Sequence, residues 1–340
     1  MDKVSVRLPT IMPHFFDDDD RNIIATINQY YKNAIKDIQN LVLIVPSEFL
    51  NVKPYTLKFK YRKYNKPSFL GRKKGTLSIS FNIDLKNTSI LYDTFIGKTK
   101  KTELTSDLPT VKQLIIIEYE QIIQDIIFAL NISYGALFHF SEGKCIFGKS
   151  AFYINNKKYK DTNFGYFPDD VYYNTLKRGW PRLQNIPFLT TWNWLYNKTN
   201  FIRGDALLRI DKALNALSYI YSTHAYDDIF YLLIGIEALY NKGKGKIINQ
   251  IEEKISRILG CCLNSKNIIR NMYDVRSNFV HGRFPIHKKN CDNDAFMKDN
   301  EKYYKSVDAA LSILICSFQI LINKDCISIE EILSFSDLNN

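Results

Sequence analysis

The stretch Met272-Tyr-Asp-Val-Arg-Ser-Asn-Phe-Val-His-Gly282 decides how the C-terminal half of this chain folds. Apolar residues recur at helical spacing over residues 267–281. Gly282 follows directly, and glycine is the residue that most often ends a helix in a left-handed C-cap. We therefore expect a helix that ends at His281.

The end of this expected helix carries Arg276 five residues before His281. That spacing sets the two residues roughly 7.5 Å apart along the axis and about 140° around it, so the long arginine can curl toward a shared groove. Arginine stays charged and can bind a phosphate bidentately. Histidine titrates near neutral pH, and the negative end of the helix dipole favours its protonated form. The pair is suited to hold one phosphate and to transfer a proton beside it. The structural alternative is that Arg276 caps carbonyls or pairs with Asp274, while His281 merely ends the helix.

Two more polar residues are candidates for the same site. Glu237 is the only charged residue between Ile229 and Tyr240, so burying it is costly unless a cation or hydrogen bonds compensate. Arg276 is the natural partner, either because Glu237 orients it or because the pair joins two helices. Asn278 lies three residues before His281, on nearly the same helix face, where it can bond the imidazole or a phosphate, or face solvent.

Three segments in this order resemble the ApeA-like branch of the HEPN ribonuclease superfamily. They are residues 230–240 with a single Glu, residues 251–260, and residues 272–282 with the Arg-x4-His pattern. The resemblance covers about residues 205–325. It implies a helical ribonuclease domain in which Arg-His pairs from two chains face each other across a symmetric dimer interface. This chain departs from the wider superfamily at Ser277, where a more polar residue often follows the arginine, and Asn278 is the candidate to replace it.

The chain has a net charge of +11, which suits a polyanionic partner such as RNA, although a composition rich in Lys, Asn, Ile and Tyr can produce the same charge. Its six cysteines show no paired metal-ligand spacing, so we expect free thiols and neither a metal nor another cofactor. The N-terminus lacks the pattern of a signal peptide. The apolar stretch 114–130 is interrupted by three acids, so we expect no membrane span and a cytoplasmic location.

The first half of the chain changes character repeatedly. Residues 4–11 suggest a strand and 23–42 a helix, and 57–62 and 76–83 alternate apolar with polar residues like a hairpin with one apolar face. A helix over 111–131 and further strands complete a mixed α/β domain, with the aromatic- and proline-rich segment 167–198 at its junction. We therefore predict an α+β protein: a mixed domain over 1–198 and an all-α helical bundle of the HEPN type over 199–340.

Residues 51–75 contain nine Lys or Arg and no acid, interleaved with aromatic residues. This is a candidate platform for an RNA backbone, on which exposed aromatic rings could stack bases. The alternative is that the rings lie in the core and the lysines are simply solvated. The RNA-binding candidates are Lys58, Lys60, Arg62, Lys63, Lys73 and Lys74, with Lys244 in a glycine-containing loop and Arg283 beside the expected site.

These features together predict a metal-independent endoribonuclease that acts as a homodimer. By the resemblance, it works in anti-phage defence or as a toxin, with a protein or phage component as trigger. The alternative is a non-catalytic HEPN module that binds RNA or nucleotide, or that serves only for dimerisation.

Overall fold

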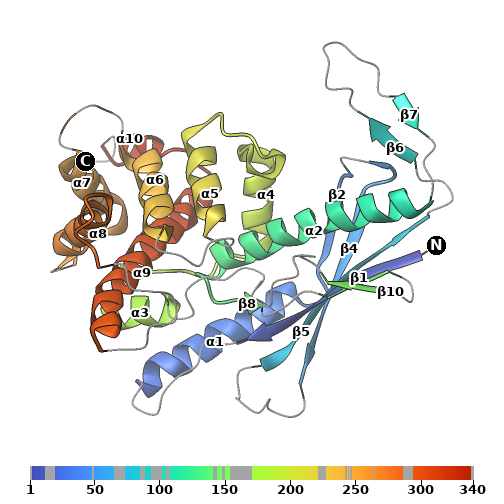
Figure 1. Cartoon of the computed structure of the whole chain (residues 1–340), viewed down its shortest axis with the longest axis horizontal. Helices are drawn as coiled ribbons and strands as arrows, with labels where there is room; N and C mark the ends of the chain where they lie inside the picture. Colours follow the sequence, from blue (N-terminus) through green and yellow to red (C-terminus); the bar gives the residue numbers. More distant parts are fainter. Residues whose placement is uncertain are drawn as a thin grey trace. The chain divides into compact units, whose positions relative to one another are not determined.

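The structure is a computed structural model of the whole chain. It describes residues 2–11, 20–47, 50–64, 73–84, 89–92, 102–104, 108–140, 144–147, 150–153, 171–220, 227–241, 243, 245, 247–262, 264–285 and 294–337. The fold is α+β, as predicted: an antiparallel sheet with its helix is followed by a mainly helical region (Figure 1).

Two compact units divide the chain. The sheet unit comprises Met1–His14, Lys32–Ile127 and Phe138–Gly165, and the helical unit comprises Phe15–Tyr31, Phe128–Leu137 and Tyr166–Asn340. The division falls within α1 (Arg21–Ile38) and within α2 (Leu108–Ser133). Each of these helices therefore supplies residues to both units.

The sheet unit is built on an antiparallel sheet of order β10-β9-β1-β5-β4-β2, with β8 paired to β1. Its strands are β1 (Asp2–Ile11), β2 (Val42–Val45), β4 (Tyr55–Lys63), β5 (Lys73–Ile83), β8 (His139–Phe140), β9 (Lys144–Phe147) and β10 (Ser150–Tyr153). A smaller sheet contains β3 (Leu50–Asn51), β6 (Ser89–Tyr92) and β7 (Thr102–Leu104).

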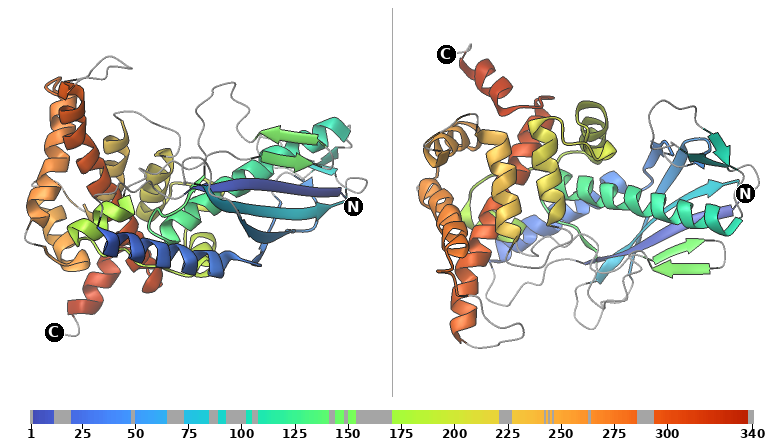
Figure 2. Two further views of the ribbon diagram at one scale, coloured as in Figure 1. Left: turned by 90° about the horizontal axis from the view of Figure 1, so that it is seen from below. Right: turned by 45° about the horizontal axis from the view of Figure 1, so that its top comes forward.

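The predicted hairpin is formed by β4 and β5, and its apolar face is covered by α2 (Figure 2). Leu57 and Phe59 are buried while the lysines between them are exposed, so the period of two set the strand orientation correctly. The Tyr119 hydroxyl of α2 donates to the Ile79 carbonyl at 2.7 Å, and its ring lies 4.8 Å from that of Phe81. These contacts fix which face of the sheet remains open.

The first helix ends earlier than predicted. α1 stops at Ile38, and Val42 already opens strand β2. Asn40 between them has a φ of 65°, in the left-handed region that asparagine tolerates better than most residues. The apolar run 41–45 therefore belongs to the sheet, although its first residues also fit the helical period.

The helical unit contains the elements from α3 to α10. They are α3 (Val171–Arg178), α4 (Phe188–Lys198), the 3-10 turn η2 (Phe201–Arg203), α5 (Arg209–Tyr219), α6 (Asp228–Tyr240), α7 (Ile247–Leu259), α8 (Ser265–Val280), α9 (Asp294–Asn323) and α10 (Ile329–Asp337). Helix α9 contacts α3, α4, α6, α7 and α8, so it is the central helix of this unit (Figure 2). Among the described residues, one stretch, Glu301–Asn323 of α9, is long and apolar enough to cross a membrane, but 89% of its apolar window is buried inside the structure, as a core helix would be.

Two helices occupy the segment that the sequence placed at a junction. Arg178 at the end of α3 donates to Asp308 at 3.1 Å and to Ser312 at 2.8 Å, both on α9. The indole of Trp194 in α4 donates to the carbonyl of Cys326 at 3.0 Å. Both helices are thus tied to the C-terminal part of the helical unit.

The start of helix α5 at Arg209 is set by a buried carboxylate. The buried carboxylate of Asp211 accepts hydrogen bonds from the amide and side chain of Asn200 and from the amide of Leu208, each at 2.9 Å. These bonds hold the residues before Arg209 outside the helix. Leu207 therefore lies outside the helix and is 74% exposed.

Candidate functional site

The C-terminal end of α8 has the predicted helix stop. Gly282 has a φ of +64°, its amide donates to the Phe279 carbonyl at 3.1 Å, and the amide of Arg283 donates to the Asn278 carbonyl at 2.7 Å. This pair of bonds is the Schellman motif that caps helices with a left-handed residue. His281 is the C-cap residue, held between the last helical turn and Gly282.

Aromatic rings anchor this helix end to its neighbours. The Phe279 ring lies 5.9 Å from Phe230 in α6, 4.9 Å from Phe284 and 6.5 Å from Tyr303 in α9. Phe284 also contacts Tyr303 at 6.2 Å, so the chain is held on both sides of His281. Edge and stacked ring pairs add specific attraction to the area that they bury. The backbone that carries Arg276 and His281 is therefore tied to two other helices.

The predicted site residues on α8 are accessible. His281 is exposed, and Arg276 and Asn278 are half-buried. Among the described residues, Arg276 forms no ion pair, neither with Asp274 nor with Glu237. The guanidinium is thus not committed to a partner within this part of the chain.

Glu237, Arg276 and Tyr273 nevertheless lie close enough to influence one another. Burial raises the pKa of Tyr273, the charge of Glu237 raises it further, and the charge of Arg276 lowers it. The Tyr273 hydroxyl is buried but does not reach the geometry of a hydrogen bond to Glu237, so the two groups interact through the charge of the carboxylate. Glu237 itself is half-buried, which makes its charge less costly than in a closed core.

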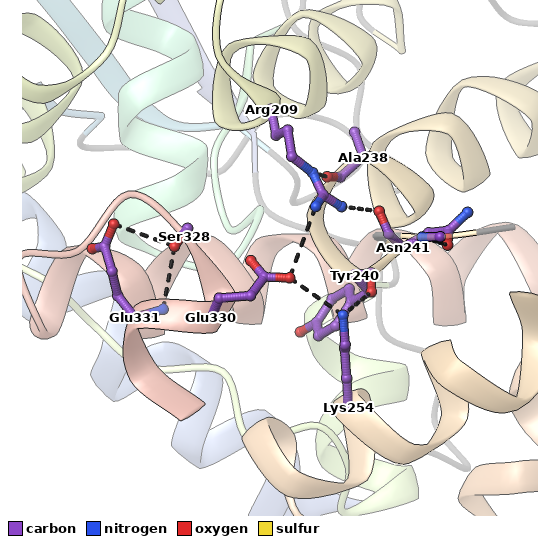
Figure 3. Close-up of polar contacts among 9 residues, drawn as sticks. Arg209, Ala238, Tyr240, Asn241, Lys254, Ser328, Glu330 and Glu331 are labelled. Carbon is purple, nitrogen blue, oxygen red and sulfur yellow. Dashed lines mark hydrogen bonds and ion pairs between the residues drawn. The ribbon is translucent and has the colours of Figure 1, made fainter. Parts of the chain in front are cut away.

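The last turn of α6, which carries Glu237, is capped by two cations (Figure 3). Arg209 donates to the carbonyls of Ala238 and Asn241, and Lys254 donates to the Tyr240 carbonyl at 2.7 Å. Glu330 of α10 joins both cations, at 3.8 Å from Arg209 and 3.2 Å from Lys254. Cations at a helix C-terminus satisfy its free carbonyls and oppose the helix dipole. The network fixes the turn from which Glu237 projects.

Apolar side chains are exposed on helices α6 and α8. Ile234, one turn before Glu237 in α6, is 50% exposed, and Val280, next to His281, is 61% exposed. Nearby on α6, the Tyr231 ring stacks on exposed Tyr219 of α5 at 4.7 Å. Helix α8, which carries the Arg-His pair, and helix α6, which carries Glu237, therefore also present unburied apolar surface.

The predicted RNA-binding residues divide by location. Lys58, Lys60, Arg62 and Lys63 are exposed on β4, and Arg283 is exposed after Gly282. Lys73 and Lys74 are strand residues of β5 whose side chains lie outside the described part, and Lys244 lies outside the described residues altogether.

The suggestion that aromatic rings of residues 51–75 stack bases is wrong for the rings of β4 that the structure buries. Tyr55 and Phe59 are 3% and 2% exposed because they point into the core beneath the sheet. The Tyr55 hydroxyl donates to buried Glu118 of α2 at 2.6 Å. These rings therefore hold the sheet to α2 and are not available to bases.

Two cations of β1 were missed by the sequence reasoning. Lys3 and Arg7 are exposed, and strand pairing sets Arg7 opposite Ser78 while Lys60 lies on the other side of the same serine. The alternation of Lys3, Ser5 and Arg7 with buried Val4, Val6 and Leu8 was a signal for their orientation. Their position beside β4 required knowledge of the strand order.

Comparisons with the models of known protein families, with curated proteins and with solved structures gave no match to this chain.

Proposed function

We propose that this protein is a metal-independent endoribonuclease of the HEPN type, in which Arg276 and His281 act on the scissile phosphate. The observation that carries the proposal is their placement: an exposed histidine and a guanidinium without an ion pair in the described part of the chain share one helix end. That helix end is fixed by a glycine cap and by an aromatic cluster. Polar side chains that are held on a rigid backbone, and that make no hydrogen bond or ion pair within the part of the chain that the structure describes, suit catalysis better than support of the fold.

The chemistry follows from the two residue types. Cleavage of RNA needs one group to remove the proton of the 2′-hydroxyl and another to protonate the leaving 5′-oxygen, while a cation stabilises the pentacoordinate phosphate. His281 moves a proton, and Arg276 binds the phosphate oxygens. The products are then a 2′,3′-cyclic phosphate and a 5′-hydroxyl.

A second copy of the chain supplies the other proton-transfer group in this proposal. One His281 cannot be base and acid at the same moment, whereas two facing sites can divide the tasks. The exposed apolar side chains of Ile234 and Val280 flank the candidate site and support an interface there. The setting that we propose is anti-phage defence or a toxin system, in which cutting RNA stops growth.

The test is to incubate the purified protein with total RNA in EDTA and to map the ends. We expect cleavage with 2′,3′-cyclic phosphate and 5′-hydroxyl ends in the wild type. Cleavage should fall at least about a thousandfold in His281→Ala, Arg276→Ala and Arg276→Lys, because an ammonium cannot reproduce the planar fork.

The control is Arg203→Ala, which removes an exposed arginine of the same unit outside the site. It should cleave like the wild type, and all variants should melt within a few degrees of it. Full activity in His281→Ala, or a strict need for Mg²⁺ with 5′-phosphate ends, would refute the proposal.

A further inference from the structure

The open face of the sheet gathers cations from two strands on either side of a third. Lys58, Lys60 and Arg62 stand on β4, and Lys3 and Arg7 stand on β1. Strand β5 lies between them, paired to both. Its residues on this face are Thr76, Ser78, Ser80 and Asn82, because their neighbours Leu77, Ile79 and Phe81 are buried on the other face. We call the five cations and the four β5 residues between them the basic sheet face.

The register gives the basic sheet face a defined layout. Lys60, Ser78 and Arg7 form one row across the strands, and Lys58, Ser80 and Ser5 form the next. Strand spacing sets the backbones of Lys60 and Arg7 about 10 Å apart, and residues 58 and 62 lie about 14 Å apart along β4. A strip of short hydroxyl side chains therefore runs along β5 between two rows of long cationic ones.

The charge on this face is not compensated from within. All five cations are exposed, and none of them forms an ion pair with a residue that the structure describes. No strand residue described on this face of β1, β4 or β5 is acidic; Asp84 follows just after the end of β5. Cations held at fixed spacing on a rigid sheet repel one another, and an anion between the rows relieves that repulsion.

The uncharged side chains of this face indicate which kind of anion it binds. The strip along β5 spans several residues, which suits a chain of anionic groups better than one small ion. Hydroxyls donate hydrogen bonds to phosphate oxygens, and most protein contacts to nucleic acid are of this backbone type. The buried rings of Tyr55, Phe59 and Phe81 are on the opposite face. Tyr64, at one end, has its hydroxyl bonded to Thr76 at 2.6 Å. Base stacking along the strip therefore has no platform in the described strands.

We infer that the basic sheet face binds single-stranded RNA through its phosphodiester backbone, laid along β5 with the bases turned away and little dependence on sequence. The choice of RNA over DNA as occupant rests on the proposed function. The binding itself is independent of cleavage, because it uses residues of the sheet unit alone.

The experiment measures binding of a fluorescein-labelled oligouridylate to the full-length chain by anisotropy, with His281→Ala as the common background so that the probe stays intact. One variant removes the β4 row (Lys58→Gln, Lys60→Gln, Arg62→Gln), and another removes the β1 pair (Lys3→Gln, Arg7→Gln). The matched control removes three exposed lysines of the helical unit: Lys212→Gln, Lys266→Gln and Lys302→Gln.

We expect the β4 variant to bind at least about tenfold more weakly near 0.1 M salt. Its slope of log affinity against log salt should fall by about 2, since each lost contact to a single strand removes about 0.7. The β1 variant should lose a slope of about 1.4. The control should stay within about twofold of the background chain. If both sheet variants behave like the control, the inference is wrong.

Two substitutions of Ser78 distinguish the effect of charge from the effect of side-chain bulk. Ser78→Glu places a carboxylate between Lys60 and Arg7, whereas Ser78→Gln adds similar bulk without charge. We expect the Glu variant to bind at least about tenfold more weakly than the Gln variant. Equal binding of the two variants would show that no phosphate lies between the rows.

Competition decides the class of partner. Oligouridylate and oligoadenylate should compete within about threefold of each other, and polyglutamate or phosphatidylserine vesicles of equal charge should compete much less. Equal competition by polyglutamate or vesicles would overturn the assignment to nucleic acid. If the wild type cleaves RNA and both sheet variants bind RNA as tightly as the background chain, only this inference is refuted. Binding that depends on the sheet face, without any cleavage, would sink only the proposed function.

Discussion

Tyr273 shows how the candidate site and the core share side chains. Its hydroxyl is buried without a hydrogen bond of good geometry in the described part of the chain, and the residue is 7% exposed. The charge of Glu237 reaches it from α6. A tyrosine that lies among the candidate site residues is thus a packing residue.

We predict that Tyr273→Phe leaves the free energy of unfolding unchanged or raises it by up to about 1 kcal/mol, because it removes a buried hydroxyl that has no partner. Tyr240→Phe is the matched control. Its hydroxyl lies 2.6 Å from that of Ser317, so its loss should cost about 1 kcal/mol. Urea unfolding measures both. A loss above 1 kcal/mol in Tyr273→Phe would mean that the hydroxyl is bonded to Glu237 in solution.

At the level of helices and strands, elements with long periodic patterns were predictable. The β4–β5 hairpin and helices α6, α7 and α8 have their expected places, because each buries one regular face. The start of α5 at Arg209 was not predictable, because it depends on how Asp211 bonds Asn200 eleven residues earlier. Helix α3 is short, and its Arg178 is tied to Asp308, 130 residues away. Local sequence carries no sign of such a partner.

Gly282 provides a test of the helix end. We predict that Gly282→Ala destabilises the protein by about 1 kcal/mol, because a Cβ at a φ of +64° is strained although the surrounding space is open. Gly282→Asn should cost less, since asparagine tolerates this conformation. Thermal unfolding measures the change.

Gly243→Ala is the control for this substitution. A Cβ at this position also meets open space, but Gly243 does not have a positive φ. The stability of the protein with Gly243→Ala should therefore stay the same or rise slightly. Equal effects of the two alanine substitutions would contradict the role of the left-handed cap.

At the scale of the whole molecule, the proposed function divides the two proton-transfer steps between two copies of the chain. Sequence reasoning found the Arg276–His281 helix end, because a local pattern defines it. It could not find the cluster of Phe279 with Phe230 and Tyr303, nor Lys3 and Arg7 beside β4, because these neighbours meet only when distant segments pack. Neighbours along one helix or strand were predictable from the sequence. Neighbours on different elements were not.

We predict that Ile234→Asp combined with Val280→Asp converts the proposed dimer to a monomer and abolishes the proposed cleavage, although Arg276 and His281 are unchanged. A charge in an apolar interface costs several kcal/mol of association. Light scattering coupled to gel filtration measures the mass. Leu189→Asp, at an exposed apolar position of α4, is the control and should remain a dimer. A wild type that is monomeric at all concentrations, or an active monomer, would contradict the prediction.

The cap after His281 also determines when conformational entropy is lost. The amides of Gly282, Arg283 and Phe284 are all bonded to carbonyls of the preceding turn, so this corner of the backbone becomes ordered as the chain folds. In the proposed enzyme, an arriving phosphate then has only the side-chain torsions of His281 and Arg276 to immobilise. Hydrogen exchange at these three amides should accordingly be slow in the free protein, and RNA should slow it little further.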